Sequence, residues 1–317
     1  MIRAFTLADG RLRPVADLAA TPEAAVWIDL LAPDDEEEAL VERLLGIDVP
    51  TLEEMVEIED SSRLYHVDGA AFVTATLPVR AGAGRPTATP VTFILAGARL
   101  VTVRYDTPRA FETFPLRAER LDLGCADGET VLLALLDAVI ERLADLLEET
   151  GRRIEGVAAE VFDGGADSAR QGYRGVLQAV GAEANMISHV LASLVTLERA
   201  IAFLAAARAG KETRARLKSL SRDARFLNEH TTFLSQKINF LLDATLGMIS
   251  IQQNAIIKIF SVAAVIFLPP TLVASIYGMN FDVIPELHWA FGYPIALGLM
   301  VASAVGSYWI FKLRGWL

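Results

Sequence analysis

A line of residues, most of them with oxygen-bearing side chains, recurs at alternating three- and four-residue steps toward the C-terminal end of the chain. Its first members are Gln236, Asn239, Asp243, Gly247, Ser250 and Asn254. The same steps continue through an apolar stretch as Ile257, Ser261, Ala264, Leu268, Thr271 and Ser275. At about 100° per residue these positions share one narrow face of a helix. Carboxylate, amide and hydroxyl oxygens are the atoms that hard divalent cations prefer as ligands.

This polar stripe has two interpretations. Small polar residues often pack transmembrane helices together. Alternatively, the stripe is the face of the helix that is in contact with water. Two features favour water: the stripe extends well outside the apolar stretch, and the charged Asp243 lies in register with the apolar-stretch positions. A mean step near 3.5 also suits parallel helices that supercoil around a shared axis. We therefore expect several copies of the chain to contribute one such helix each.

Two long stretches near the C-terminus contain no charged residue. The first lies between Lys258 and Asp282, and the second lies between Glu286 and Lys312. Each exceeds the roughly 20 residues that a helix needs to cross the hydrocarbon core. We predict two transmembrane helices, with a buried soluble hairpin as the alternative. Because basic residues flank the pair and only acids lie in the loop, both termini are expected in the cytoplasm.

The first apolar stretch ends in Tyr277-Gly278-Met279-Asn280-Phe281, and Pro285-Glu286-Leu287 and Trp289 follow. This pattern resembles the loop of the CorA family of magnesium transporters, with Ile284 where methionine is usual. The similarity is close from about Ser235 to Leu317 and looser upstream. The resemblance implies a homopentamer in the bacterial inner membrane, with a funnel-shaped cytosolic domain and a pore lined by the first span. It also implies passive Mg²⁺ uptake, and passage of Co²⁺ and Ni²⁺.

The resemblance indicates Gly278, Met279 and Asn280 as the selectivity element. Mg²⁺ gives up its waters reluctantly, so a ring of Asn280 carbonyls could hold the hydrated ion loosely enough to release it. The alternative for Asn280 is an ordinary residue that ends a helix. Ile257 and Leu268 would narrow the lumen, or simply pack between helices. The predicted pore-lining residues are Asp243, Ser250, Asn254, Ile257, Ser261, Leu268, Thr271 and Ser275.

Short β-like segments and helical segments alternate before about residue 127, which predicts an α+β cytosolic domain resembling an α/β/α sandwich. Helical segments follow, and the last begins near Glu212. No Pro or Gly pair interrupts it before the membrane, so we expect one helix of roughly 65 residues, about 100 Å long. The predicted sections are residues 1–127 (α/β), 128–257 (helical stalk), 258–279 (first span), 280–290 (outer loop), 291–311 (second span) and 312–317 (basic cytosolic tail).

Acids dominate the N-terminal part. Fourteen acids and one base, Arg43, lie between Glu23 and Asp60. These acids form either a solvated surface or one that gathers cations. Together with Asp223 they suggest a regulatory role for Mg²⁺, which would relieve repulsion between the acids of adjacent copies. A plain ion pair between Asp223 and Arg222 is the alternative.

Other classes of protein fit the sequence less well. A net charge of −11 argues against a nucleic-acid partner. A zinc-transporting member of the same superfamily remains an alternative, but the stripe contains no His or Cys. A membrane-tethered scaffold would leave the stripe unexplained. We find no nucleophile–base pair or phosphate loop, so we expect neither an enzyme nor a catalytic cofactor.

Overall fold

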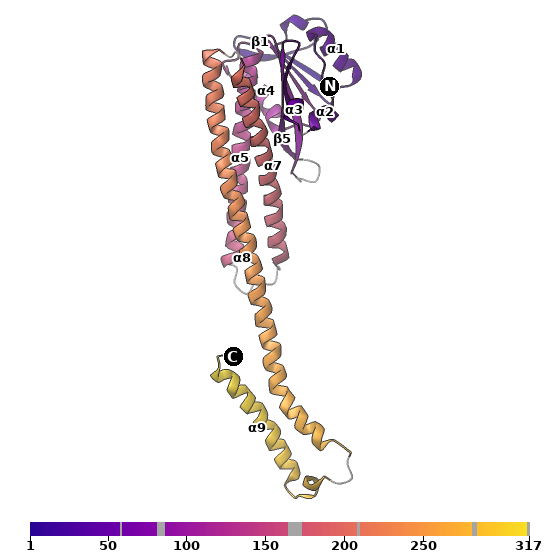
Figure 1. Ribbon diagram of the computed structural model, residues 1–317, viewed down its shortest axis with the longest axis vertical. Helices are drawn as coiled ribbons and strands as arrows, with labels where there is room; N and C mark the ends of the chain where they lie inside the picture. The colour runs from indigo at the N-terminus through magenta and orange to yellow at the C-terminus, as the bar shows by residue number, and fades with distance from the viewer. Residues whose placement is uncertain (58, 81–85, 164–172, 208–209, 281–283, 316–317) are drawn as a thin grey trace. The chain divides into compact units, whose positions relative to one another are not determined.

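A computed structural model describes residues 1–57, 59–80, 86–163, 173–207, 210–280 and 284–315 (Figure 1). The chain forms two compact units, Met1–Leu242 and Asp243–Leu317. One helix, α8 (Lys211–Tyr277), contributes to both. Its 67 residues confirm the predicted long helix that enters the first apolar stretch.

The first unit is built on a seven-stranded sheet. Its strand order is β2-β1-β3-β7-β6-β5-β4, and neighbouring strands are antiparallel except for the parallel pair β3 and β7. The strands are β1 (Ile2–Ala8), β2 (Arg11–Val15), β3 (Trp27–Leu31), β4 (Leu64–Val67), β5 (Ala70–Arg80), β6 (Pro86–Ala96) and β7 (Arg99–Arg104).

Helices cover both faces of this sheet because its strands bury side chains on both sides. In β3, Ile28 and Leu30 belong to a core shared with Val41 of α1 and Met55 of α2. Trp27 points the other way and packs on the phenylalanines of α4. The predicted α/β/α arrangement is therefore confirmed. These helices are η1 (Pro22–Ala24), α1 (Asp35–Leu45), α2 (Leu52–Val56), α3 (Asp60–Arg63), α4 (Arg109–Arg120), α5 (Gly128–Asp163) and α7 (Tyr173–Ala206).

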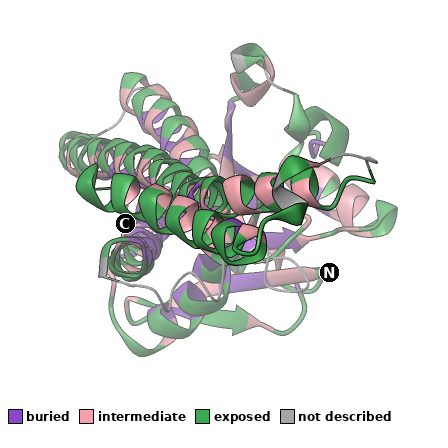
Figure 2. Cartoon of the chain, turned by 90° about the horizontal axis from the view of Figure 1, so that it is seen from below, coloured by how far each residue is buried: buried purple, intermediate pink, exposed green. Residues whose placement is uncertain are grey.

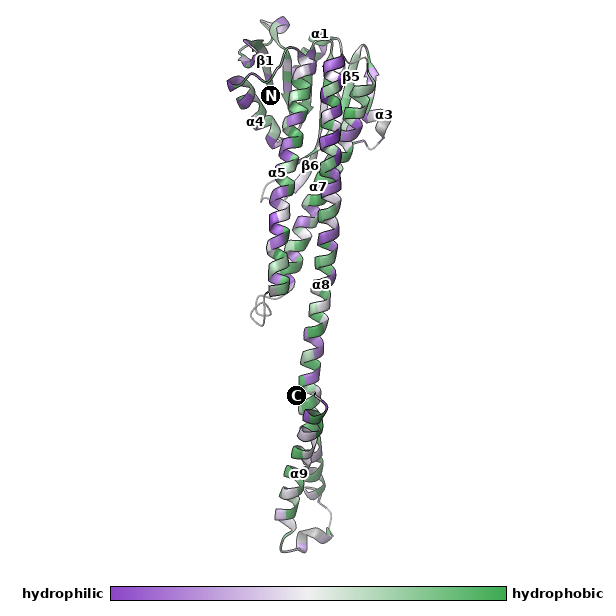
Figure 3. Cartoon of the chain, turned by 90° about the vertical axis from the view of Figure 1, so that its left-hand side faces the viewer, coloured by the Kyte–Doolittle hydropathy of each residue, from purple (hydrophilic) through white to green (hydrophobic). Residues whose placement is uncertain are grey.

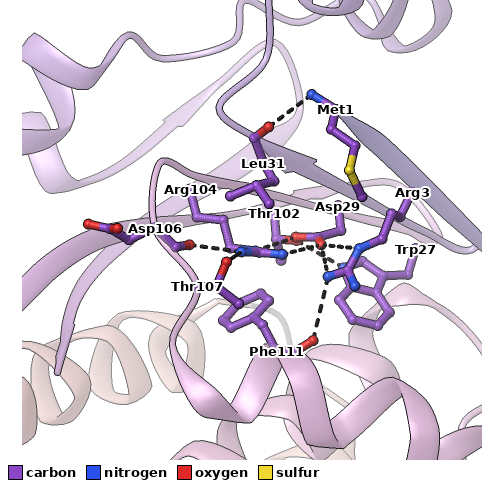
Figure 4. A network of polar contacts seen from close by, with 10 residues as sticks. All are labelled: Met1, Arg3, Trp27, Asp29, Leu31, Thr102, Arg104, Asp106, Thr107 and Phe111. Atoms are coloured by element: carbon purple, nitrogen blue, oxygen red, sulfur yellow. Dashed lines mark hydrogen bonds and ion pairs between the residues drawn. The ribbon is translucent and has the colours of Figure 1, made fainter. Parts of the chain in front are cut away.

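A buried ion network ties the sheet to the segment that leads into α4 (Figure 4). Asp29 on β3 has no exposed surface, and its carboxylate accepts hydrogen bonds from Arg104 of β7 at 2.9 and 3.0 Å. It also accepts from Arg3 of β1 and from the Thr102 hydroxyl. Arg104 in turn donates to the Asp106 carbonyl and lies 5.0 Å from the centre of the Phe111 ring.

In the first unit, α8 packs on α5 and α7 through one apolar face. The buried residues of this face follow alternating three- and four-residue steps and are Leu217, Leu220, Ala224, Leu227, Thr231, Leu234, Ile238 and Leu241. Polar contacts flank them: Asn228 donates to Glu198 of α7, and Lys237 pairs with Glu155 of α5 at 3.4 Å. A heptad-like repeat thus holds α8 against its own chain.

The second unit consists of the C-terminal part of α8, the short helix η3 (Pro285–His288) and α9 (Gly292–Leu313). Helices α7, α8 and α9 are each long and apolar enough to cross a membrane. Within the most apolar window of α7, 44% of the residues are buried, against 6% in α8 and 6% in α9. Apolar residues dominate α9 and the end of α8 that precedes it (Figure 3). The apolar side chains of α7 thus pack inside the first unit, whereas those of α8 and α9 match the two predicted spans.

Candidate ion pathway on helix α8

The polar stripe of α8 is uncovered in a single copy of the chain. Every one of its positions is exposed: Gln236, Asn239, Asp243, Gly247, Ser250, Asn254, Ile257, Ser261, Ala264, Leu268, Thr271 and Ser275. Figure 2 shows that exposed residues predominate on the long helices nearest the viewer. Asp243 follows the buried Leu234 by nine residues, so at about 100° per residue the two point in opposite directions. The stripe therefore lies on the side of α8 opposite the residues that are buried in the first unit.

Helix α9 also leaves the stripe uncovered. In the second unit Val262 of α8 is buried and Val273 is half-buried, as is expected of the side that faces α9, where Ala296 is buried. Leu268 and Ile257, the predicted apolar constrictions, keep 63% and 60% of their surface exposed. In this unit the stripe side of α8 is thus more exposed than the side that contains Val262 and Val273, as the predicted register requires.

Two prolines interrupt the hydrogen bonding of α8 near the middle of the first apolar stretch. Pro269 and Pro270 lack the N–H groups that would bond the carbonyls of Val265 and Ile266, yet the helix continues. The Thr271 hydroxyl donates to the Phe267 and Leu268 carbonyls at 3.0 and 2.9 Å. A hydroxyl that donates keeps acceptor lone pairs, so Thr271 can still accept a hydrogen bond from a water of a hydrated ion.

Helix α8 ends at the residues that the sequence indicates for selectivity. The Gly278 N–H bonds the Ala274 carbonyl at 2.9 Å, and the Met279 N–H bonds the Ile276 carbonyl at 3.3 Å. A Cβ on Gly278 would lie 3.0 Å from that Ala274 oxygen, which is a close contact. Met279 and Asn280 are exposed. Phe281 and Asp282, the next residues of the predicted loop, lie outside the described residues, as do residues 316–317 of the predicted tail.

Several acids of the N-terminal part have local structural partners. The side chain of Asp34 caps α1, and the Glu37 carboxylate accepts a hydrogen bond from the Asp34 N–H. At the start of α2 the Glu54 carboxylate likewise accepts a hydrogen bond from the Thr51 N–H. The Glu42 carboxylate accepts a hydrogen bond from the Val49 N–H. Partial burial, followed by the nearby charges of Asp35, Glu42 and Asp34, raises the pKa of Glu38. These roles explain part of the acidic excess without a bound cation.

Asp223, the predicted regulatory residue, is half-exposed on α8 and lies 3.8 Å from the Arg222 guanidinium. The pKa of Asp137 on α5 is raised, mainly because the carboxyl is partly buried. The negative charges of Glu141 and Asp223 raise this pKa further, and the positive charges of Arg216 and Arg117 oppose the increase. Among the described residues, no group of three or more His, Cys, Asp or Glu side chains could hold a metal ion within one copy.

Comparisons with known proteins identify the family of the chain. The model of the family "CorA-like Mg2+ transporter protein" matches residues 22–313. The magnesium transport protein CorA of Pasteurella multocida is 37% identical, and that of Haemophilus influenzae is 34% identical; each alignment covers 100% of both chains. The complete structure of the CorA magnesium transporter from Methanocaldococcus jannaschii shares the fold, with a TM-score of 0.81, 20% identity, and coverage of 100% of this chain and 99% of that one. The chain belongs to the CorA-like Mg²⁺ transporter family.

Proposed function

We propose that copies of this chain assemble as a homopentamer around their α8 helices and conduct Mg²⁺ passively across the bacterial inner membrane. The polar face of α8 carries this proposal, because all of its positions are exposed in one copy of the chain. An oxygen-rich face inside a bilayer needs water or protein beside it. A ring of identical helices supplies both, and the curated relatives are magnesium transport proteins.

In this assembly Asn280 selects the ion at the outer mouth. Its side-chain amide is exposed just after the end of α8. Copies arranged around an axis would therefore present a ring of neutral carbonyl oxygens. Such a ring accepts hydrogen bonds from the waters of hydrated Mg²⁺ and leaves the ion's inner shell intact. Gly278 keeps the turn close to α8. Co²⁺ and Ni²⁺ form similar hydrated octahedra and would also pass.

The remaining stripe forms the pathway to the cytoplasm. Thr271, Ser275 and Ser261 offer hydroxyls within the membrane, and Asn254 and Asp243 continue the path inside. Ile257 and Leu268 narrow the lumen and gate it by excluding water. Intracellular Mg²⁺ bound between copies near Asp223 would relieve acidic repulsion and favour closure. Both termini lie in the cytoplasm, consistent with the basic flanks of the two spans.

Replacement of Asn280 by alanine tests the proposal. Asn280→Ala protein in proteoliposomes should lose selective Mg²⁺ uptake and still assemble, because Asn280 is exposed and supports no packing within one copy. Asn185→Ala, at an exposed position of α7, is the matched control and should transport normally. Parallel measurements with Co²⁺ and Zn²⁺ distinguish the zinc-transporting alternative. Wild-type Mg²⁺ flux and selectivity in Asn280→Ala would refute the role of Asn280.

A further inference from the structure

Five basic side chains form an exposed row at the start of α8. The row lies in the first unit, all of its members are exposed, and the members are Lys211, Arg214, Lys218, Arg222 and Arg225. Steps of three and four residues separate them, so at about 100° per residue they share one face of the helix. Because the chain has a net charge of −11, this row has the opposite sign to the molecule that carries it.

The basic row is a source of repulsion within α8. Like charges three or four residues apart lie close together on a helix and destabilise it. Within the described part of the chain, Arg222 is the one member with an acidic partner: its guanidinium lies 3.8 Å from the Asp223 carboxylate and donates to the Ser219 hydroxyl at 3.2 Å. The other four members have no ion pair there. An anion bound along this face would therefore relieve the repulsion.

The length of the row fits a short polyanion. Its ends, Lys211 and Arg225, are separated by about 21 Å of helix. The next step on the same face is Glu229, whose negative charge ends the row. A long polyanion would extend onto this acid, whereas a chain of a few phosphates fits within the row. Lysine and arginine bind phosphate oxygens through charge-assisted hydrogen bonds. Since 33 residues of continuous helix separate Arg225 from Lys258, where the first apolar stretch begins, lipid phosphates fit this position less well.

We propose that the basic row binds a polyphosphate chain, either that of a nucleoside triphosphate or an inorganic oligophosphate, in its metal-free form. Mg²⁺ binds such chains through their phosphate oxygens and cancels part of their charge. The row therefore binds the metal-free chain more tightly than its Mg²⁺ complex, and occupancy of the row decreases as the concentration of Mg²⁺ rises.

The position of the row connects this site to the ion pathway. The same helical face continues from Arg225 through Glu229 and Thr232 to Gln236, the first residue of the polar stripe. Each of these positions is exposed. A ligand whose binding depends on Mg²⁺ would thus lie on the face of α8 that the proposed function assigns to the ion. The inference goes beyond that function, because binding of the polyphosphate requires only one copy of the chain.

The test is equilibrium dialysis of the full-length protein in mild detergent against ATP and, in a second arm, against inorganic tripolyphosphate, both without divalent cations. Combined Arg214→Gln, Lys218→Gln and Arg222→Gln substitutions should weaken binding of both by at least about tenfold, because each removes one pair of opposite charges. The matched control removes three exposed bases from β2, α4 and α5 and should bind as the wild type does; its substitutions are Arg11→Gln, Arg120→Gln and Arg152→Gln. Saturating Mg²⁺ should weaken ATP binding to the wild type several-fold.

Glutamine favours helix and removes the repulsion, so the row variant should melt no lower than the wild type. Equal affinities for ATP and tripolyphosphate would assign the site to the phosphate chain alone, and tighter binding of ATP would assign it to a nucleoside triphosphate. The proposal would be overturned by a wild type that binds neither, by wild-type affinity in the row variant, or by binding that Mg²⁺ strengthens. Tighter binding of a single-stranded oligonucleotide than of tripolyphosphate would also overturn it. These measurements involve no transport, so their failure leaves the ion pathway standing, and normal Mg²⁺ flux in Asn280→Ala leaves the phosphate site standing.

Discussion

Replacement of Asp29 by asparagine should destabilise the first unit by several kilocalories per mole. The carboxylate is fully buried and accepts hydrogen bonds from Arg104, Arg3 and Thr102, with donor–acceptor distances of 2.8 Å to Thr102 and 2.9 and 3.0 Å to Arg104 (Figure 4). The Arg104 side chain is also fully buried. Asparagine preserves the shape but removes the charge, and its amide nitrogen must face guanidinium donors.

The magnitude follows from the uncompensated charge. Breaking a buried ion pair by removing one partner costs about 3–5 kcal/mol. Arg3 is 30% exposed and can turn to water, whereas Arg104 cannot. Because a unit of this size loses about 2–4 °C of melting temperature per kilocalorie, we expect a decrease of about 6–20 °C. The position of Arg104 also sets the segment that leads into α4, through its bonds to the Asp106 carbonyl and the Thr107 hydroxyl.

The assay is thermal unfolding of the full-length protein in detergent, followed by circular dichroism. Asp145→Asn is the control: this aspartate is 62% exposed and 3.6 Å from Arg142, and such surface pairs contribute at most about 1 kcal/mol. An apolar replacement of the pair, Asp29→Leu with Arg104→Met, should recover much of the loss. A melting temperature for Asp29→Asn within about 2 °C of the wild type would contradict the reasoning, since that corresponds to less than about 1 kcal/mol.

Two further predictions concern the ion pathway and its regulation. In a background without Cys125, cysteines that replace Asp243, Asn254 and Thr271 should react with water-soluble thiol reagents. A cysteine that replaces the half-buried Val273 should stay protected. Equal labelling on both sides of α8 would contradict the predicted register. Millimolar Mg²⁺ should protect the cytosolic part of α8 from limited proteolysis, and Asp223→Lys should change that protection because it reverses the charge that neighbours Asp137; cleavage that is indifferent to Mg²⁺ would remove the regulatory proposal and leave the pore proposal standing.

Local and periodic features of this protein were predictable from the sequence. The two apolar stretches, the long helix and the polar stripe depend on spacing within one segment, and both apolar stretches form helices, in α8 and α9. The first helix was equally local: Asp34 caps its start, and Gly46 ends it in a left-handed conformation with φ of 66°. The family resemblance rested on the loop after the first apolar stretch and on similarity from about Ser235 to Leu317. The roles of Asn280, Asp223 and the stripe residues remain predictions.

Contacts between distant segments were decided only by the tertiary structure. The parallel pairing of β3 with β7 and the burial of Asp29 depend on residues about 75 positions apart, which no local periodicity records. The same holds for α8. Only the packing of α5 and α7 shows that the repeat containing Leu234 is buried within the chain. That packing leaves Phe233 and the polar stripe exposed within one copy of the chain.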